Sequence, residues 1–343
     1  MGSPLRIDFL PSCRPICPHL WRATSDSAEL ACGRLFFRNS GRNSTSLLPL
    51  FNEKAVQSDV NRTERKPVIR WRFVLGSAFL YLVVITMAPL PDLLVLFPST
   101  HRIDAGAAIR KPISFQDGDL EIWTAKSKLA KERGEAEFHV LRFYGNADRA
   151  DRWVADEAEM WNNRAVEVWG MNYPGFGGST GPARLARLGP AALTAFDTVK
   201  QSAGDRPIIV FGASLGTTTA LHVAVHRPVA GLILHNPPPI REMILRQFGW
   251  WNLWLLAGPL SRKVPADLDS ITNARAIHVP AVFLLAEEDE VVAPRFQRLV
   301  VDAYAGEKRL ISLAGANHNS PLEGTGLRRF YEALDWLLPK DLD

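Results

Sequence analysis

The sequence predicts an α/β fold in which helices cover both faces of a mostly parallel β-sheet. After residue 98, apolar runs of strand length alternate with segments of helical period, and this alternation is typical of parallel sheets. The length of 343 residues is enough for one large domain with an appendage, and the hydrophobic content of 47% supports a sizeable core. Several apolar runs are followed directly by polar, chemistry-bearing residues, as at the carboxyl edge of a parallel sheet.

The strands and helices are assigned by these two periods and by the turn residues between them. Strands are expected at 111–115, 120–124, 138–143, 165–172, 207–213, 229–235, 280–286 and 308–313. Helices are expected at 149–161, 190–203, 217–225 and about 326–338. Residues 126–137 are interpreted as a charged loop.

The strand at 207–213 leads directly into Gly212-Ala-Ser214-Leu-Gly216, and a segment with helix-forming character follows. A G-x-S-x-G sequence between a strand and a helix indicates a sharp turn that exposes one serine above the sheet. The alternative is an ordinary β-turn-α connection with a capping serine. The motif makes Ser214 a candidate nucleophile.

A serine hydroxyl needs a base, and the base needs an orienting acid. The strand at 280–286 ends in four acids, of which Asp289 is favoured because two valines follow it; Glu287 and Glu288 remain possible substitutes. The strand at 308–313 ends in a glycine-containing loop that carries His318. A solvated loop histidine and a solvated acidic loop are the plain alternatives.

An oxyanion formed at such a serine needs two preorganised N–H donors. The N–H of Leu215, the residue after the candidate nucleophile, is the first candidate. The strand at 138–143 ends at Tyr144-Gly145-Asn146, and glycine lets the backbone approach a substrate, so the N–H of Asn146 is the second candidate.

Five motifs in order resemble the Bem46/ABHD13-type branch of the α/β-hydrolase superfamily. They are Tyr144-Gly-Asn-Ala147, Tyr173-Pro-Gly-Phe-Gly-Gly-Ser179, Gly212-Ala-Ser-Leu-Gly216, Glu288-Asp-Glu-Val-Val292 and Gly315-Ala-Asn-His-Asn319, and the resemblance covers roughly residues 110–338. It implies an α/β-hydrolase fold with an eight-stranded, mostly parallel sheet and a small cap. It also implies a serine hydrolase whose catalytic residues are Ser214, Asp289 and His318.

The chain departs from the family pattern at three places. Tyr144 stands where the family has histidine, Leu285-Ala286 stands where it has His-Gly, and Ala293 is an extra residue before Pro294. The first departure lies beside the oxyanion loop and is expected to affect substrate choice. None of them removes a candidate catalytic residue.

The sequence between the strands at 229–235 and 280–286 is expected to form a cap over the site, at about 238–279. The cap contains a tryptophan-rich stretch, 243–256, for which three interpretations are open. It could pack as the core of the cap, line a pocket for an acyl chain, or dock on a membrane interface, where tryptophan is favoured.

The N-terminal segment differs from the rest of the chain in charge and in cysteine content. Residues 1–72 carry 12 Lys/Arg against 6 Asp/Glu, so the net charge of +4 comes from this segment and gives no support for nucleic-acid binding. All three cysteines lie there, at 13, 17 and 32, without a metal-site spacing. We expect residues 1–66 to be disordered; a transit peptide, or a start site assigned too far upstream, is an alternative.

Residues 73–90 contain no charged side chain, and as a helix they would measure about 27 Å, close to a hydrocarbon core. We therefore expect a single transmembrane anchor within 70–97 and a hydrolase domain over 98–343. Basic residues are more frequent before this run than after it, which favours a cytoplasmic N-terminus and a periplasmic or lumenal hydrolase domain. A cleavable signal ending near residues 86–88 is the alternative.

These observations predict a membrane-anchored enzyme that cleaves a hydrophobic ester or thioester, with a lipid-like acyl substrate and without a metal or organic cofactor. Two alternatives stay open: a catalytically silent, membrane-tethered interaction protein, and a serine peptidase that uses the same three residues.

Overall fold

The computed structural model describes residues 71–87, 90–161, 163–249 and 255–338. The chain divides into two compact units, Met1–Leu75 and Gly76–Asp343. Of the first unit, only the beginning of helix α2 (Trp71–Met87) is described. The tail predicted to be disordered, 1–66, and its three cysteines lie outside the described residues.

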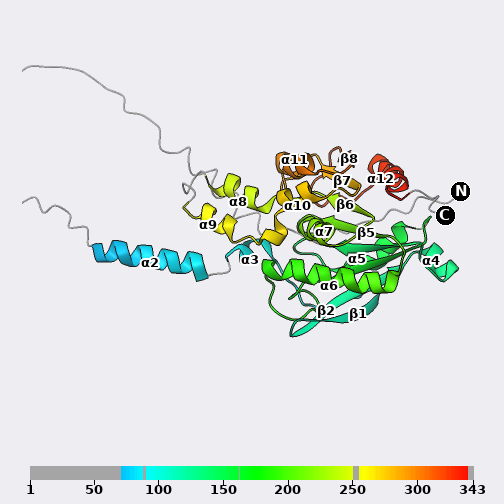
Figure 1. Ribbon diagram of the computed structural model, residues 1–343, viewed down its shortest axis with the longest axis horizontal. Helices are drawn as coiled ribbons and strands as arrows, with labels where there is room; N and C mark the ends of the chain where they lie inside the picture. The colour runs from blue at the N-terminus through cyan, green and yellow to red at the C-terminus, as the bar shows by residue number, and fades with distance from the viewer. Residues whose placement is uncertain (1–70, 88–89, 162, 250–254, 339–343) are drawn as a thin grey trace, which may run out of the picture. The chain divides into compact units, whose positions relative to one another are not determined.

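An eight-stranded sheet forms the centre of Gly76–Asp343, in the order β1-β2-β4-β3-β5-β6-β7-β8 (Figure 1). The first two pairings, β1 with β2 and β2 with β4, are antiparallel, and all other neighbours are parallel. The strands are β1 (Ile109–Phe115), β2 (Gly118–Lys126), β3 (Phe138–Phe143), β4 (Val166–Met171), β5 (Ile208–Ala213), β6 (Gly231–His235), β7 (Ala281–Ala286) and β8 (Lys308–Leu313). The predicted mostly parallel, eight-stranded sheet is confirmed.

Helices pack on both faces of the sheet. The helices on one face are α6 (Leu185–Ala203), α7 (Leu215–His226), α10 (Ser270–Ala276) and α11 (Pro294–Ala303), and those on the other are α5 (Ala150–Met160) and α12 (Gly324–Leu337). Within β5, Val210 contacts the first cluster and Ile209 the second. Because successive side chains alternate between two buried faces, the central strands are continuously apolar in sequence.

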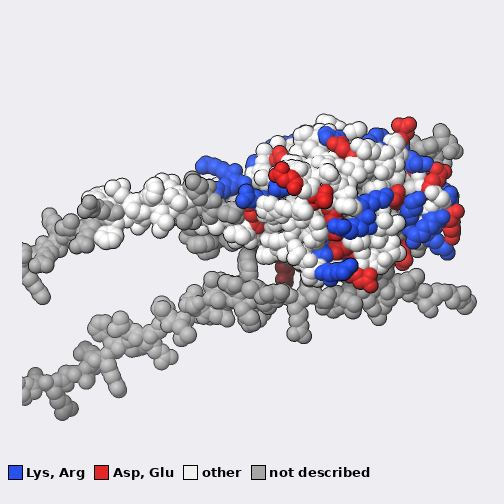
Figure 2. Space-filling model, turned by 90° about the horizontal axis from the view of Figure 1, so that it is seen from below, with Lys and Arg blue, Asp and Glu red and all other residues white. Residues whose placement is uncertain are grey.

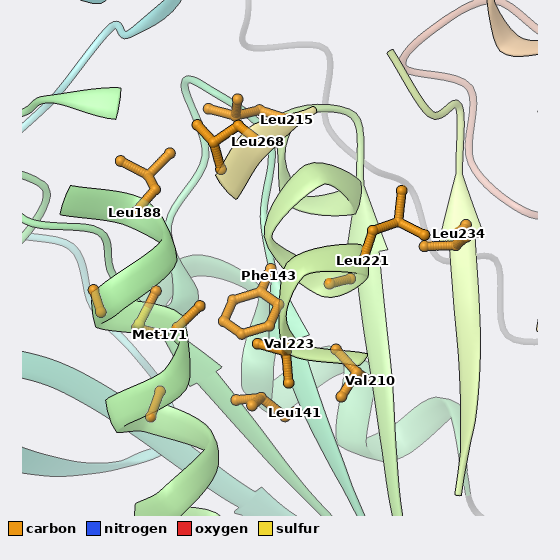
Figure 3. Close-up of a cluster of buried hydrophobic side chains, with 14 of the residues drawn as sticks. Leu141, Phe143, Met171, Leu188, Val210, Leu215, Leu221, Val223, Leu234 and Leu268 are labelled. Atoms are coloured by element: carbon orange, nitrogen blue, oxygen red, sulfur yellow. The ribbon is translucent and has the colours of Figure 1, made fainter. Parts of the chain in front are cut away.

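The larger core cluster lies between α6, α7 and the sheet. Figure 3 shows Leu188 of α6 and Leu221 of α7 on either side of Phe143, which projects from β3. Phe143 and Leu221 are fully buried, and Leu215, at the start of α7, is buried in the same cluster. This packing fixes the start of α7 against the carboxyl ends of β3 and β5.

Two local predictions are wrong. Helix α6 begins at Leu185 rather than at Pro190, which lies inside the helix, and the carboxylate of Asp92 accepts a 2.8 Å hydrogen bond from the Leu185 N–H. A helix-capping side chain that comes from a distant segment leaves no local sequence signal at the start of the helix. The expected charged loop 126–137 contains a short helix, α4 (Lys128–Arg133), which Ser127 caps at one end and Gly134, with φ 81°, ends at the other.

The stretch where the cap was expected contains α8 (Ile240–Phe248), α9 (Ala257–Arg262), a 3₁₀ turn η1 (Ala266–Leu268) and α10. The guanidinium of Arg241, in α8, links the start of this stretch to its later part. It pairs with Asp269 at 2.7 Å and donates to the Val264 carbonyl. The tryptophans at 250, 251 and 254 lie outside the described residues.

Of the apolar run at 73–90, residues 73–87 lie in α2 and Leu90 begins α3 (Leu90–Val95), while residues 88 and 89 lie outside the described residues. The described helix α2 has 17 residues, Trp71–Met87. Among the described residues, no helix has both the length and the hydropathy needed to cross a membrane. The single transmembrane helix expected within 70–97 is therefore not found in them.

Charges of both signs are interspersed on the described part of the face that Figure 2 shows. Ion pairs elsewhere on the domain surface follow the same pattern, including the two-bond pair of Arg227 with Asp197, 2.7 and 2.8 Å. A surface that attracts a polyanion would instead concentrate one sign of charge.

Candidate active site

Ser214 lies at the turn between β5 and α7 in a conformation that non-glycine residues rarely adopt, with φ 50° and ψ −123°. Its N–H donates to the His235 carbonyl of β6 at 2.8 Å, so the neighbouring strand holds the turn. Backbone strain of this kind persists only where the surroundings over-determine it, and it presents the side chain above the sheet edge.

The start of α7 lies directly on the backbone at the end of β3. A Cβ added to Gly216 would lie 2.1 Å from the Phe143 carbonyl oxygen and 2.8 Å from that of Tyr144. Gly145 is close to the same turn, since a Cβ there would lie 3.7 Å from the Cβ of Ser214. This close approach brings the Ser214 turn and the loop at 144–147 together.

Ser214, His318 and Asp289 form one hydrogen-bonded chain across three loops. The Ser214 Oγ lies 3.0 Å from His318 Nε2, and His318 Nδ1 lies 2.7 Å from Asp289 Oδ2. The Asp289 side chain is fully buried and that of His318 is 14% exposed. A buried carboxylate on one ring nitrogen orients the other toward the serine hydroxyl.

The carboxylate of Asp289 has hydrogen-bond partners on both oxygens. Its Oδ1 accepts from the N–H groups of Val291 and Val292, at 2.8 and 2.7 Å, and its Oδ2 accepts from Gln297 Nε2 at 3.1 Å, besides His318. The three neighbouring acids, Glu287, Glu288 and Glu290, are exposed. The structure thus joins Asp289, and neither of the substitutes considered from sequence, to His318.

Sequence reasoning missed two side chains that hold this arrangement. Gln297 of α11 is 1% exposed and donates to Asp289 Oδ2 and, at 2.8 Å, to the Val292 carbonyl. Asn236, which follows β6, accepts from the Ala286 N–H at 2.9 Å and donates to the His318 carbonyl at 3.3 Å. A buried glutamine in an amphipathic helix has no distinctive sequence signal; Asn236 could have been suspected, because it directly follows a parallel strand.

The two N–H groups expected to bind an oxyanion lie on either side of this close approach. Leu215 is the first residue of α7, and a first-turn N–H has no acceptor within its helix. For the Asn146 N–H, the structure gives no acceptor among the residues it describes. Within the part of the chain that the structure describes, neither N–H group has a backbone acceptor.

Arg142 and Tyr144, both buried, form a group with the partly buried Glu157 at this loop. Arg142 pairs with Glu157 at 2.8 Å and stacks on the Tyr144 ring, and the Tyr144 hydroxyl donates to Glu157 at 2.8 Å. Burial and the nearby Glu157 carboxylate raise the pKa of Tyr144 well above its usual value. The Tyr144 ring is thus a neutral, 2% exposed group under α5.

His235 lies in the strand next to Ser214. Burial, with Arg142 and His318 nearby, lowers the pKa of His235 to about 3, so the ring is neutral at pH 7. The neutral ring adds no positive charge next to His318.

A metal site is not indicated by the geometry. Among the residues that the structure describes, there is no group of three or more His, Cys, Asp or Glu side chains that could hold a metal ion.

Comparison with known proteins identifies the fold. The family model described as the alpha/beta hydrolase fold matches residues 139–257. An esterase from Pyrococcus furiosus is similar with a TM-score of 0.52 and 14% identity, over 71% of this chain and 97% of that one. Est1E from Butyrivibrio proteoclasticus, solved with ferulic acid bound, has a TM-score of 0.52 and 16% identity, over 66% of this chain and 96% of that one. The chain has the α/β-hydrolase fold.

Two uncharacterized proteins of Mycobacterium tuberculosis, from strains CDC 1551 and H37Rv, are each 31% identical to this chain over 130 residues. The match covers 36% of this chain and 44% of each relative, so the chain spans less than half the length of these curated relatives.

Proposed function

We propose that this chain is a serine hydrolase of the Bem46/ABHD13-type branch that cleaves an ester or thioester through an acyl-enzyme. The observation that carries the proposal is the hydrogen-bonded chain from Ser214 Oγ through His318 to the buried Asp289. In this order a nucleophile, a base and an orienting acid are in direct contact.

In the proposed reaction His318 Nε2 accepts the proton of Ser214 Oγ as the oxygen attacks the substrate carbonyl carbon. Asp289 keeps the Nδ1 proton in place and stabilises the imidazolium that forms. His318 then donates the proton to the leaving alcohol or thiol as the carbon–leaving-group bond breaks. A water molecule repeats the sequence on the acyl-enzyme and releases the acid.

The tetrahedral intermediate carries a negative oxygen that must be stabilised. The proposed donors are the N–H groups of Leu215 and Asn146, and the first also lies at the positive end of the α7 dipole. Donors fixed before the reaction need no reorganisation during it, so their position affects kcat more than KM.

The proposed substrate has an apolar acyl group. The stretch expected to form the cap carries Leu255, just before α9, which is 67% exposed, and Leu93 of α3, which contacts α9, is also 67% exposed. An apolar acyl chain would be desolvated there. On this basis we expect longer-chain esters to be hydrolysed with a lower KM than acetate.

We propose in addition that residues 70–97 attach the protein to a membrane, with a cytoplasmic N-terminus and a periplasmic or lumenal hydrolase domain. Helix α2 carries exposed Trp71, Phe73, Leu75, Phe79 and Leu80 and has no charge after Arg72. Attachment is tested by alkaline carbonate extraction of membranes from cells that express the full chain. Recovery of the protein only in the supernatant would contradict it.

The hydrolase proposal is tested with p-nitrophenyl esters of increasing chain length and the full chain. Replacing Ser214, His318 or Asp289 by alanine is expected to lower kcat by at least about 10³-fold, because each removes one part of the proton-transfer chain. The matched control is Asp302→Ala, which removes an exposed carboxylate on α11 and is expected to leave kcat unchanged.

Two results would overturn the proposal. A folded wild type that hydrolyses no ester or thioester would favour the silent interaction protein. Turnover of peptide p-nitroanilides at rates above those of the matched esters would favour the peptidase. Equal rates for acetate and longer esters would contradict only the proposed apolar acyl substrate.

A further inference from the structure

Residues 92–101, which we call the strap, run from within α3 across the carboxyl edge of the sheet before β1. The strap contacts three separate parts of the domain, and one of them is the loop that carries Asn146. It lies outside every motif that carries the family resemblance.

The strap holds Asn146 by two hydrogen bonds. The side-chain Nδ2 of Asn146 donates to the Val95 carbonyl at 2.9 Å, and the Phe97 N–H donates to the Asn146 carbonyl at 3.3 Å. The preceding carbonyl, that of Gly145, accepts from the Asp148 N–H at 3.3 Å. The Asn146 N–H therefore lies between two carbonyls that are both engaged, and its own direction is set by them.

The strap is fixed to the domain at both ends. Asp92 caps α6 through the 2.8 Å bond from the Leu185 N–H, and the residue at the start of α6, Arg184, makes no side-chain cap of its own. Four residues later Leu96 is 4% exposed and belongs to the main core cluster.

At the other end the Ser99 carbonyl accepts from the Gly177 N–H at 2.9 Å and from Arg149 at 3.2 Å, and the His101 carbonyl accepts from Arg149 at 2.6 Å. Arg149 is itself 3% exposed and paired with Asp151. The two bonds to Asn146 are thus presented by a segment with buried anchors on both sides.

We propose that the strap is a positioning element for the oxyanion hole: it fixes the loop of Asn146 so that the Asn146 N–H points to the reacting carbonyl oxygen. The proposal rests on the proposed function, because it assigns the second oxyanion donor. The physical reason is that a loop donor contributes fully only if it is ordered before the transition state forms. Without the strap, the loop would have to become ordered in each turnover. The conformational entropy lost in ordering it would offset part of the transition-state stabilisation that the donor provides.

The test uses the full chain with p-nitrophenyl butyrate, and it measures kcat, KM and the midpoint of thermal unfolding. Asn146→Ala removes the bond to Val95 and keeps the backbone N–H. It is expected to lower kcat about tenfold or more with KM within about twofold, as for a misplaced catalytic group.

A second variant disturbs the strap without touching the loop. Asp92→Ala removes the anchor on α6 and is expected to lower kcat by several-fold, again at constant KM. Asp92→Asn keeps the accepting oxygen and is expected to restore most of kcat. In the double variant Asn146→Ala, Asp92→Ala, kcat is expected to fall little further than in Asn146→Ala, because both changes act through the same contacts.

The control is Asp104→Ala, just beyond the strap. Asp104 accepts from the Gly106 N–H at 3.1 Å and is exposed, and its loss is expected to leave kcat, KM and the unfolding midpoint unchanged.

Three results would overturn the proposal. If Asn146→Ala lowers kcat and Asp92→Ala does not, Asn146 acts without the strap. If Asp92→Ala lowers the unfolding midpoint at unchanged kcat, the strap has only a structural role. If both variants keep wild-type kcat, the strap does not position a donor. Failure of the proposed function would show differently, as a wild type no faster than Ser214→Ala.

Discussion

At the scale of single residues, the geometry of the site depends on side chains that do no chemistry. Asp289 receives hydrogen bonds on both carboxylate oxygens, and only one of these four donors, His318, belongs to the proposed reaction. The other three hold the carboxylate in position for its hydrogen bond with His318. Gln297 is the one side chain among these three.

Replacing Gln297 by leucine is expected to lower kcat about tenfold, because Asp289 Oδ2 loses a donor that fixes its position. The free energy of unfolding should fall by about 1–3 kcal/mol, since the buried Asp289 and the Val292 carbonyl lose a partner. Ester hydrolysis and urea unfolding measure the two effects. Gln201→Leu, at an exposed position of α6, is the control. Unchanged kcat in Gln297→Leu would show that the two valine N–H groups suffice.

Gly216→Ala is expected to abolish activity, because the new Cβ would lie 2.1 Å from the Phe143 carbonyl oxygen and push α7 away from the oxyanion loop. The matched change is Gly258→Ala in α9, where nothing lies within 4 Å of the added carbon. In Gly216→Ala, activity should be lost and the midpoint of thermal unfolding should fall. In Gly258→Ala, both should stay at their wild-type values. Retained activity in Gly216→Ala would contradict the close packing of the turn.

At the scale of elements, a carboxylate of β2 holds the loop at 173–179. Glu121 Oε2 accepts from the Gly178 N–H and from Asn172 Nδ2, both at 2.7 Å, and Oε1 pairs with Arg110. Burial acts to raise the pKa of Glu121, but the hydrogen bonds from Gly178, Arg110 and Asn172 outweigh it and the pKa is lowered. The Glu121 carboxylate therefore stays ionised and accepts the hydrogen bonds from Gly178 and Asn172.

Glu121→Gln is expected to destabilise the fold by about 1–3 kcal/mol. The NH₂ of the new amide would face an N–H group that donates to the carboxylate in the wild type. Urea unfolding measures the change. Glu132→Gln breaks an exposed pair with Lys128, 3.9 Å apart, and is expected to cost less than about 0.5 kcal/mol. Equal effects of the two substitutions would mean that the loop is held by other contacts.

The sequence predicts those elements whose signal is local. Each of Ser214, Asp289 and His318 follows an apolar strand, and the carboxyl ends of neighbouring parallel strands meet at one edge. The helix α4 was also locally encoded, by Ser127 and Gly134, but its charged sequence was interpreted as a loop. The start of α6, the strap and the Gln297 contact could not be predicted, because each depends on segments far apart in the chain.

At the scale of the whole molecule, histidines with lowered pKa values make stability depend on pH. Burial, with the nearby charges of Arg206, Lys111 and Lys126, lowers the pKa of His139 to about 4, and His235 is lowered to about 3. In the unfolded chain a histidine titrates near 6.5. Between these values the unfolded state binds more protons, so stability is fully present above about pH 6.5 and is lost as the pH falls toward 4.

For His139 alone the loss between pH 7.5 and pH 5 is on the order of 2 kcal/mol. His139→Gln is expected to have a smaller loss over this interval than the wild type, when urea unfolding is measured at both pH values. His278→Gln, which removes an exposed histidine, should keep the wild-type slope. A slope unchanged in His139→Gln would show that His139 does not become protonated on unfolding.

Covalent labelling with a fluorophosphonate tests whether Ser214 is an activated nucleophile. One adduct per chain is expected, located by peptide mapping on Ser214, absent from Ser214→Ala and formed much more slowly in His318→Ala. A folded wild type that remains unlabelled, or an adduct on another serine, would contradict it.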